Sequence, residues 1–412
     1  MVLPLITPHF PTVRNQTGIE CRIPAAYAVL PKQKELSMRL PGYCIATLLT
    51  QAALAVTAQA APPQYRVEAF AGPPGALRFS VTEINNAGSV SGTLVNPVTG
   101  REEAFLYHRG RYETPGSLGG FASAGIDVNR RGQLLVNTHD AFLHPLQAFV
   151  VSRGRASAIP LPTGATGPVV AVDINNAGHV LGITAGGGSA LPFIYDGQVS
   201  RFIELPSVER LNLVGFNDRD EIVGDISFPD RSDIQPFTFS NGRLTVLPLP
   251  PDEPPVFRDF TRVFSTRINN AGQILANVSG TVDGHVEDED FPVIHGAGGY
   301  TQIGPTNTSF FTDLNEKGWA VGGHVIDFGD PPTLRAAIYR DGQFFDLDRL
   351  LRPADAAVWT LSSSHALNDR GQVIGFGNLG AFIATPVPEP GALALMVAGL
   401  LGVGAGVRRR TG

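Results

Sequence analysis

The side chains best suited to chemistry in this sequence are carboxylates and amides placed just before a glycine. Residues 173–178 read Asp-Ile-Asn-Asn-Ala-Gly, and residues 313–318 read Asp-Leu-Asn-Glu-Lys-Gly. Oxygen ligands on alternate residues before a glycine suit Ca²⁺. The fifth position, however, is not a ligand type, and no glutamate closes either loop. The pattern therefore favours a structural Asn-Gly turn, with calcium as the alternative and no other cofactor implied.

The remaining titratable residues show no catalytic or metal-binding spacing. The histidines after residue 60 form no His-Glu-x-x-His or similar motif; they are His108, His139, His144, His179, His285, His295, His324 and His365. His139 and His144 are interpreted as an ordinary loop pair, with a metal site as the alternative. No nucleophile elbow, Walker loop or dinucleotide fingerprint occurs. Residues 283–290 form a dense acidic run, expected to be a solvated loop, with a cation or partner site as the alternative.

Composition limits the classes of partner. The 412 residues include 47 glycines and 33 prolines, and only 17% are charged, which predicts many turns and short strands. Residues 61–388 hold 23 basic and 34 acidic side chains, a net charge near −11. This argues against nucleic acid as a partner, because polyanion binding needs clustered lysine and arginine. Both cysteines, Cys21 and Cys44, precede this body, which excludes from it a disulfide framework and a cysteine nucleophile.

The two segments with alternate oxygen ligands, residues 173–178 and 313–318, are here called the calcium-like segments. Both belong to a motif that recurs seven times. Residues 84–88 read Ile-Asn-Asn-Ala-Gly, residues 174–178 and 268–272 repeat them, and four weaker copies complete the set. The first asparagines of the copies, here called the lead asparagines, are 42 to 53 residues apart: Asn85, Asn129, Asn175, Asn217, Asn269, Asn315 and Asn368. A period of this length predicts a repeat architecture.

Each copy has the pattern of a β-hairpin, with an apolar strand before and after a four-residue turn. Asparagine at the first turn position can cap its own backbone, and glycine three residues later accepts the left-handed conformation. Six copies have that glycine: Gly88, Gly132, Gly178, Gly272, Gly318 and Gly371. The fourth copy has Asp220, the next most tolerated type of residue there. Val136 replaces a later glycine in the second copy, so we interpret that later position as packing.

A second hairpin follows the first in most copies. Residues 192–198 read Pro-Phe-Ile-Tyr-Asp-Gly-Gln before another apolar stretch, and similar segments start at residues 104, 148, 236 and 337. Each copy thus contains four short strands, the content of a β-propeller blade. We predict an all-β, seven-bladed propeller-like ring over residues 61–385. Because the last copy lacks a fourth strand, we expect residues 65–70 to complete that blade and close the ring.

The segment before the ring has the features of a secretory signal. Residues 38–60 contain a basic start, an apolar core and small residues, Ala58 and Ala60, three and one positions before a cut after Ala60. We interpret residues 1–37 as a disordered leader or a mis-assigned start upstream of Met38. A buried helix over residues 38–60 is the alternative.

The segment after the ring predicts a membrane-anchored sorting tag over residues 386–412. Val387-Pro388-Glu389-Pro390 is followed by 17 uncharged residues, 391–407, near the lower limit for a membrane-spanning helix. Arg408, Arg409 and Arg410 come next, and positive residues stay on the cytoplasmic side, which places the body outside. A plain C-terminal anchor is the alternative.

This tail resembles the PEP-CTERM sorting signal. The resemblance implies recognition by an exosortase, export across the inner membrane of a Gram-negative bacterium, transient anchoring, and then a cell-surface or extracellular location. The repeats from about residue 80 to 385 resemble the HAF repeat of probable extracellular proteins. Its His-Ala-Phe signature is reduced to Ala-Phe at Ala104-Phe105 and Ala148-Phe149. That family implies no established chemistry.

The leading hypothesis is a non-catalytic binding or structural component of the cell surface or exopolysaccharide matrix, with polysaccharide or envelope proteins as partners. One alternative is a secreted glycan hydrolase or lyase, since propellers can gather carboxylates around a central channel. A second is a purely structural matrix component, which predicts self-association and no soluble ligand.

Overall fold

A computed structural model of the chain describes residues 63–387, apart from 71, 187–188, 206–209, 228–233, 251–257, 283–284 and 330. The expected leader, the signal segment with Ala58 and Ala60, and the tail from Pro388, including residues 391–407 and the three arginines, lie outside the described residues. Within the described ranges, no helix is long and apolar enough to cross a membrane.

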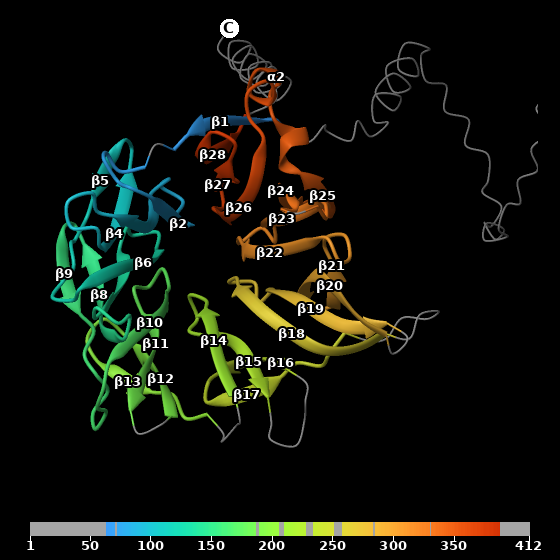
Figure 1. Ribbon diagram of the computed structural model, residues 1–412. Coiled ribbons are helices and arrows are strands. Elements are labelled where there is room, and N and C mark those ends of the chain that lie inside the picture. The colour runs from blue at the N-terminus through green and yellow to red at the C-terminus, as the bar shows by residue number, and fades with distance from the viewer. Residues whose placement is uncertain are drawn as a thin grey trace, which may run out of the picture. The chain divides into compact units, whose positions relative to one another are not determined.

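The described residues form seven four-stranded antiparallel sheets arranged as the blades of a ring (Figure 1). Blade 1 contains β2 (Phe79–Ile84), β3 (Val90–Val95), β4 (Glu102–His108) and β5 (Arg111–Glu113). Blade 2 contains β6 (Ala122–Val128), β7 (Leu134–His139), β8 (Pro145–Ser152) and β9 (Arg155–Ala158). Blade 3 contains β10 (Val169–Ile174), β11 (Val180–Gly186), β12 (Ser189–Tyr195) and β13 (Ser200–Phe202).

Blade 4 contains β14 (Arg210–Phe216), β15 (Ile222–Ser227), β16 (Gln235–Ser240) and β17 (Arg243–Val246). Blade 5 contains β18 (Arg258–Ile268), β19 (Ile274–Val282), β20 (His285–Gly296) and β21 (Gly299–Gln302). Blade 6 contains β22 (Ser309–Leu314), β23 (Ala320–Asp327), β24 (Thr333–Arg340) and β25 (Gln343–Asp346). A short 3-10 helix, η1 (Leu347–Leu350), and the one-turn α2 (Pro353–Ala356) lead into blade 7.

Blade 7 is made from both ends of the described chain. It contains β26 (Leu361–Leu367), β27 (Val373–Gly377) and β28 (Gly380–Pro386), and its outer strand is β1 (Tyr65–Ala69). The β1–β28 register runs from Tyr65 opposite Pro386 to Ala69 opposite Phe382. Tyr65, at 0% exposure, packs in the same apolar cluster as Phe382. The expected seven-bladed ring and its closure by this N-terminal strand are confirmed.

Aromatic packing accounts for the glycine that follows the turn in four of the blades. In blades 1, 3, 4 and 7 this glycine lies opposite a fully buried phenylalanine of the next strand; the pairs are Gly92–Phe105, Gly182–Phe193, Gly224–Phe237 and Gly375–Phe382. A β-carbon on Gly92 would lie 2.6 Å from the Phe105 ring. In blade 2 Val136 takes this place, and its partner Phe149 is only partly buried. The position is therefore one of packing, as expected.

Polar residues on the second strands link neighbouring blades. Asn277 accepts a hydrogen bond from the Phe311 backbone N–H at 3.1 Å and donates one to its carbonyl at 3.0 Å. Asp225 accepts the equivalent bond from the Ser265 N–H at 2.8 Å. Burial raises the pKa of Asp225.

The acidic run differs from the expected loop. Residues 285–290 begin β20, and the backbone pairs Asp290 with Ser279 and His285 with Val282. Hairpin pairing with β19 extends the strands through this segment, because a ladder needs only backbone groups.

Candidate functional site

The lead asparagines stand at one end of the innermost strands. Every lead asparagine directly follows the first strand of its blade, and its side-chain oxygen accepts the backbone N–H groups two and four residues later. The glycine three residues on has a positive φ, 76° at Gly88, and Asp220 takes its place at 56°. The asparagine therefore caps the turn as predicted from the sequence.

The same asparagines link all seven blades in a closed ring of hydrogen bonds. Each Nδ2 donates to the backbone carbonyl of the lead asparagine in the next blade, over 2.8 to 3.2 Å. The last of these bonds, from Asn368 to Asn85, spans the seam of the ring at 2.9 Å. All seven asparagines are at most 5% exposed. We call the end of the ring that carries them the upper face.

The residues after the lead asparagines form a second ring nearer the solvent. They are Asn86, Arg130, Asn176, Asp218, Asn270, Glu316 and Asp369. In six of the seven junctions the backbone N–H of one residue donates to the side-chain oxygen of the next, at 2.8 to 2.9 Å. The exception is the junction from Asn86 to Arg130, because the arginine side chain has no oxygen to accept the bond. Arg130 instead contacts the Asp369 carboxylate at 2.6 Å.

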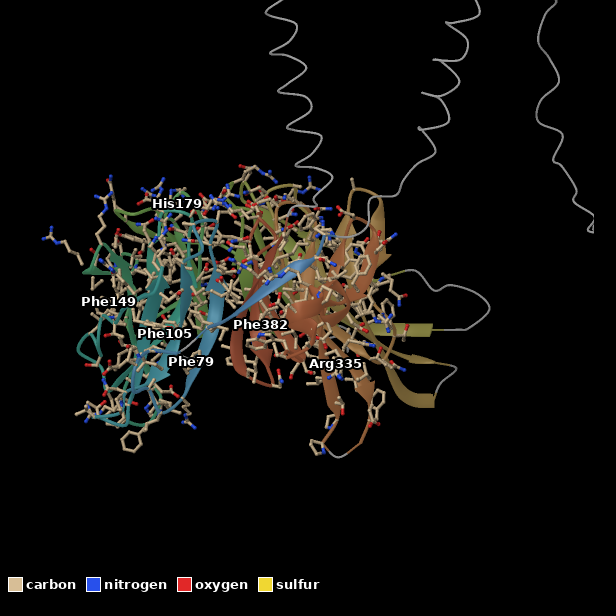
Figure 2. The ribbon with its side chains drawn as sticks, turned by 90° about the horizontal axis from the view of Figure 1, so that it is seen from above. Phe79, Phe105, Phe149, His179, Arg335 and Phe382 are labelled. Carbon is tan, nitrogen blue, oxygen red and sulfur yellow. The ribbon has the colours of Figure 1, made fainter. Side chains whose placement is uncertain are left out.

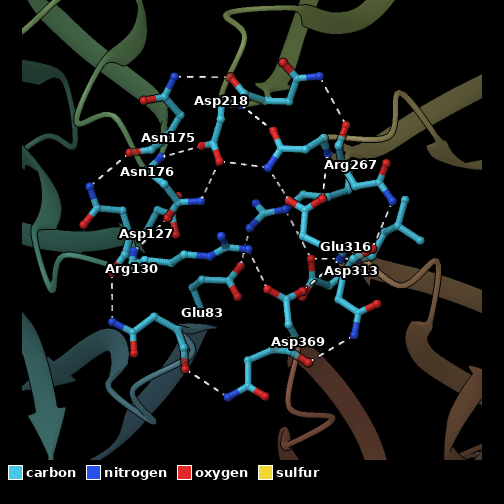
Figure 3. Close-up of a pocket in the computed structure, with 18 of the residues that line it drawn as sticks. Glu83, Asp127, Arg130, Asn175, Asn176, Asp218, Arg267, Asp313, Glu316 and Asp369 are labelled. Atoms are coloured by element: carbon cyan, nitrogen blue, oxygen red, sulfur yellow. Dashed lines mark hydrogen bonds and ion pairs between the residues drawn. The ribbon is translucent and has the colours of Figure 1, made fainter.

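Below this ring, four carboxylates and one arginine line the channel, and Figure 3 labels Glu83, Asp127, Asp313 and Arg267 among them. Glu83, Asp127, Asp173 and Asp313 and the cation Arg267 make up what we call the channel cluster. Each lies two residues before a lead asparagine and directly after a β-bulge in the innermost strand. A bulge re-aims the following side chain, and here all five converge.

Arg267 is the cation of the cluster. Its Nη2 lies 2.7 Å from Glu83 Oε2, and its Nε lies 3.2 Å from Asp313 Oδ1. The four carboxylate residues are 4–8% exposed. Burial alone lowers the pKa of Arg267, but the surrounding carboxylates, first Glu83 and then Asp313, outweigh it and raise that pKa well above its usual value.

Two carboxyl groups of the cluster have strongly raised pKa values. Burial, followed by the charge of Asp313, raises the pKa of Glu83 well above its ordinary value. Burial, followed by the Asp173 carboxylate, does the same to the pKa of Asp127. One cation facing four buried carboxylates leaves excess negative charge, which favours the neutral form of these carboxyl groups.

Backbone amides donate to both oxygens of two aspartates of the cluster. Asp173 accepts the N–H of Ile174 at 2.8 Å and that of Phe216, in the next blade, at 3.1 Å. Asp313 likewise accepts from Leu314 and Leu367, both at 2.8 Å. The two aspartates of the calcium-like segments are therefore engaged in joining blades. Across the described part of the chain, no three His, Cys, Asp or Glu side chains are grouped as a metal site.

A cavity of about 120 Å³ lies at this end of the channel, lined by the channel cluster and both rings. That volume accommodates a few water molecules or a small polar group. Its walls offer amide, carboxylate and guanidinium groups, which can bind hydroxyl or charged groups of a ligand.

The histidines do not gather. His144 Nδ1 lies 3.0 Å from Asp140 on the β7–β8 loop, whereas His139 pairs in the β-ladder with Pro145. His179, on the upper face (Figure 2), contacts Asp220 of the next blade at 2.9 Å. This contact gives Asp220 a structural role at a turn position that is glycine in the other six copies.

The channel cluster was missed as a unit by sequence reasoning. Aligning the seven copies on their lead asparagines would have shown Glu, Asp, Asp, Gly, Arg, Asp and Ala two positions earlier. A single arginine among acidic residues at one repeat position was the available signal. Gly215 belongs to the same set, because a β-carbon there would lie 2.7 Å from the Asp173 carboxylate.

The blades, the closed ring and the channel define the class of this protein as a seven-bladed β-propeller. No protein-family model matches the sequence. No curated protein matches it either. Among solved structures it is similar to the acylaminoacyl peptidase of Pyrococcus horikoshii, with 10% identity and a TM-score of 0.50 over 77% of this chain and 53% of that one. At this identity the likeness shows the fold alone.

Two further similar structures differ more. One is the propeller domain of the Trilobed protease from Pyrococcus furiosus, with 9% identity, a TM-score of 0.49, and coverage of 73% of this chain and 90% of that one. The other is the virginiamycin B lyase of Staphylococcus aureus, with 9% identity, a TM-score of 0.43, and coverage of 79% and 100%. The chain spans about half the length of the acylaminoacyl peptidase.

Proposed function

We propose that this protein is an exported, exosortase-sorted propeller that acts as a non-catalytic binding or structural component of the cell surface or polysaccharide matrix. The observation that carries the proposal is the engagement of the channel carboxylates by backbone amides of neighbouring blades and by Arg267. Asp173 and Asp313 each accept two backbone amides, and Glu83 contacts Arg267 at 2.7 Å. Carboxylates held in this way support a role in joining blades.

The position of the ring between the two end segments supports export and sorting. β1 begins five residues after the proposed cut at Ala60, and β28 ends at Pro386, beside the Val387-Pro388-Glu389-Pro390 motif. The Val387 N–H donates to the Gln64 carbonyl at 2.7 Å. Cleavage before Tyr65 and after Pro386 would leave all strands of every blade in the protein.

A glycan-active enzyme is the second candidate, favoured by the gathering of carboxylates at one end of the channel. A glycosidase needs a pair of neighbouring carboxyl groups, and the one that acts as the acid has a raised pKa. Asp127 has the raised pKa, next to Asp173. Both residues are buried, however, at 6% and 5% exposure.

The test is fractionation of the producing strain, followed by the mass of the protein in envelope and medium and its retention on the strain's own exopolysaccharide. We expect a mass that lacks residues 1–60 and the C-terminal tail, together with retention and no release of reducing ends. Release of reducing ends that an Asp173→Asn variant abolishes would favour the enzyme. Absence of retention on both polysaccharide and envelope extracts would contradict the binding role.

A further inference from the structure

Two neighbouring blades carry the same tripeptide in the same turn. Arg109-Gly110-Arg111 connects β4 to β5 in blade 1, and Arg153-Gly154-Arg155 connects β8 to β9 in blade 2. Because the strands of a blade alternate in direction, these turns lie on the upper face with the lead asparagines. The equivalent turns of blades 3, 4 and 6 have Asp-Gly or Asn-Gly instead.

The first arginine of each tripeptide has an unfavourable backbone conformation. Arg109 has a φ of 49° and Arg153 a φ of 51°, and the following glycines are at 83° and 75°. Two-residue hairpin turns of this kind prefer asparagine or aspartate at the first position. Asn241 and Asp341 occupy it in blades 4 and 6, both with a φ of 52°. A residue that breaks a local preference twice, at equivalent positions, indicates a function for its side chain.

The arginines of these turns are exposed and without ion-pair partners. Arg109, Arg111, Arg153 and Arg155 are all exposed, as is Arg131 on the neighbouring turn of blade 2. Among the described residues none of the five forms an ion pair, whereas Arg130 contacts Asp369. Arg153, Gly154 and Gly132 line one small cavity together with Glu113 of β5, so the turns of blade 2 meet the edge of blade 1.

We propose that these paired Arg-Gly-Arg turns bind an anionic polysaccharide through its carboxylate groups. A guanidinium pairs with a carboxylate through two parallel hydrogen bonds. The fold repeats the cationic pair at a fixed offset from blade 1 to blade 2, which suits a linear polymer that repeats its anionic group. The inference rests on the proposed function and names the class of polymer.

Nucleic acid fits these observations less well. Duplex DNA carries about one charge per 1.7 Å of its axis. A polyuronate carries one charge per sugar, and the body around the patch has a net charge near −11, which repels dense phosphate more strongly.

The experiment is affinity electrophoresis of the full chain through gels containing polygalacturonate or neutral dextran, with a separate titration of a DNA duplex. The patch variant combines Arg109→Asn, Arg111→Gln, Arg153→Asn and Arg155→Gln. Asparagine at the two strained positions copies the turn at Asn241, so this variant retains a favourable turn. The control variant removes four exposed arginines elsewhere: Arg78→Gln, Arg243→Gln, Arg262→Gln and Arg349→Gln.

We expect the wild-type protein to be retarded by polygalacturonate, the patch variant to bind at least about tenfold more weakly, and the control variant to bind within about twofold of wild type. The proposal would be overturned if the wild type and the patch variant bound polygalacturonate equally, or if polygalacturonate did not retard the wild type at all. Equal retardation of the wild type by dextran, or tighter arginine-dependent binding of DNA, would also overturn it. Retention of the patch variant on the producer's own matrix would overturn this site and leave the proposed function standing. Loss of wild-type retention there would contradict the proposed function itself.

Discussion

Replacing Arg267 with glutamine removes the one positive charge in the channel cluster. Arg267 contacts Glu83 at 2.7 Å and Asp313 at 3.2 Å, and these two side chains are only 11% and 6% exposed. Breaking a buried ion pair from one side costs about 3–5 kcal/mol. Arg267 is itself 29% exposed, so we expect the lower end, about 3 kcal/mol at pH 8.

The loss should depend on pH in a defined direction. The pKa of Glu83 is raised in the folded protein, so its contribution to stability is complete below the ordinary glutamate pKa, about 4.3, and is lost as pH rises through the raised pKa. Removing Arg267 raises the pKa of Glu83 and of Asp313 further. The destabilisation should therefore be larger at pH 8 than at pH 5.

Urea unfolding of the full chain, followed by tryptophan fluorescence, measures this effect. Trp359, at 7% exposure, reports on blade 7. The triple variant Arg267→Gln, Glu83→Gln, Asp313→Asn should recover much of the loss at pH 8, because it also removes the unpaired charges. An equal loss for Arg267→Gln at pH 5 and pH 8, with no recovery in the triple variant, would show that packing of the arginine stem matters and would refute the electrostatic reasoning.

Four further outcomes follow from the same geometry. Asn269→Ala should destabilise the chain by about 2–4 kcal/mol in urea unfolding, because it leaves the buried carbonyl of Asn315 and two partly buried backbone N–H groups without partners. A change under about 0.5 kcal/mol would contradict the hydrogen-bonded ring. Gly182→Ala should lower the melting temperature measured by circular dichroism, since its β-carbon would lie 2.5 Å from the Phe193 ring; an unchanged value would contradict the packing argument. Asp225→Asn should stabilise the protein more at high pH than at low pH, because burial raises the pKa of Asp225 in the folded protein and so disfavours its ionised form there; a gain independent of pH in urea unfolding would contradict this. Arg109→Asn with Arg153→Asn should raise the melting temperature, because asparagine tolerates the left-handed conformation better than arginine; a lower value would show that these turns are not strained.

Local sequence patterns predicted the blades because their determinants are short-range. An asparagine that caps its own turn, and a glycine such as Gly88 three residues later, act within one hairpin and recur with each copy. The closing strand at Tyr65–Ala69 was also predictable, since seven copies supplied one strand too few at the C-terminal end. The acidic run at residues 285–290 was not, because backbone pairing with β19 determines its conformation.

By itself the sequence determined the number of blades, the turns between their strands and the partner of the first strand, because these depend on residues near one another in the chain or on counting strands. Only the tertiary structure decided what the motif residues do beyond their own turn. Six of the asparagine bonds run between copies 42 to 53 residues apart, the seventh joins Asn368 to Asn85 over 283 residues, and Arg267 contacts Glu83 from 184 residues away. The two Arg-Gly-Arg tripeptides, 44 residues apart, likewise came onto neighbouring turns of one face only when the ring assembled. Such contacts depend on how the blades pack around the channel, which no single copy of the repeat contains.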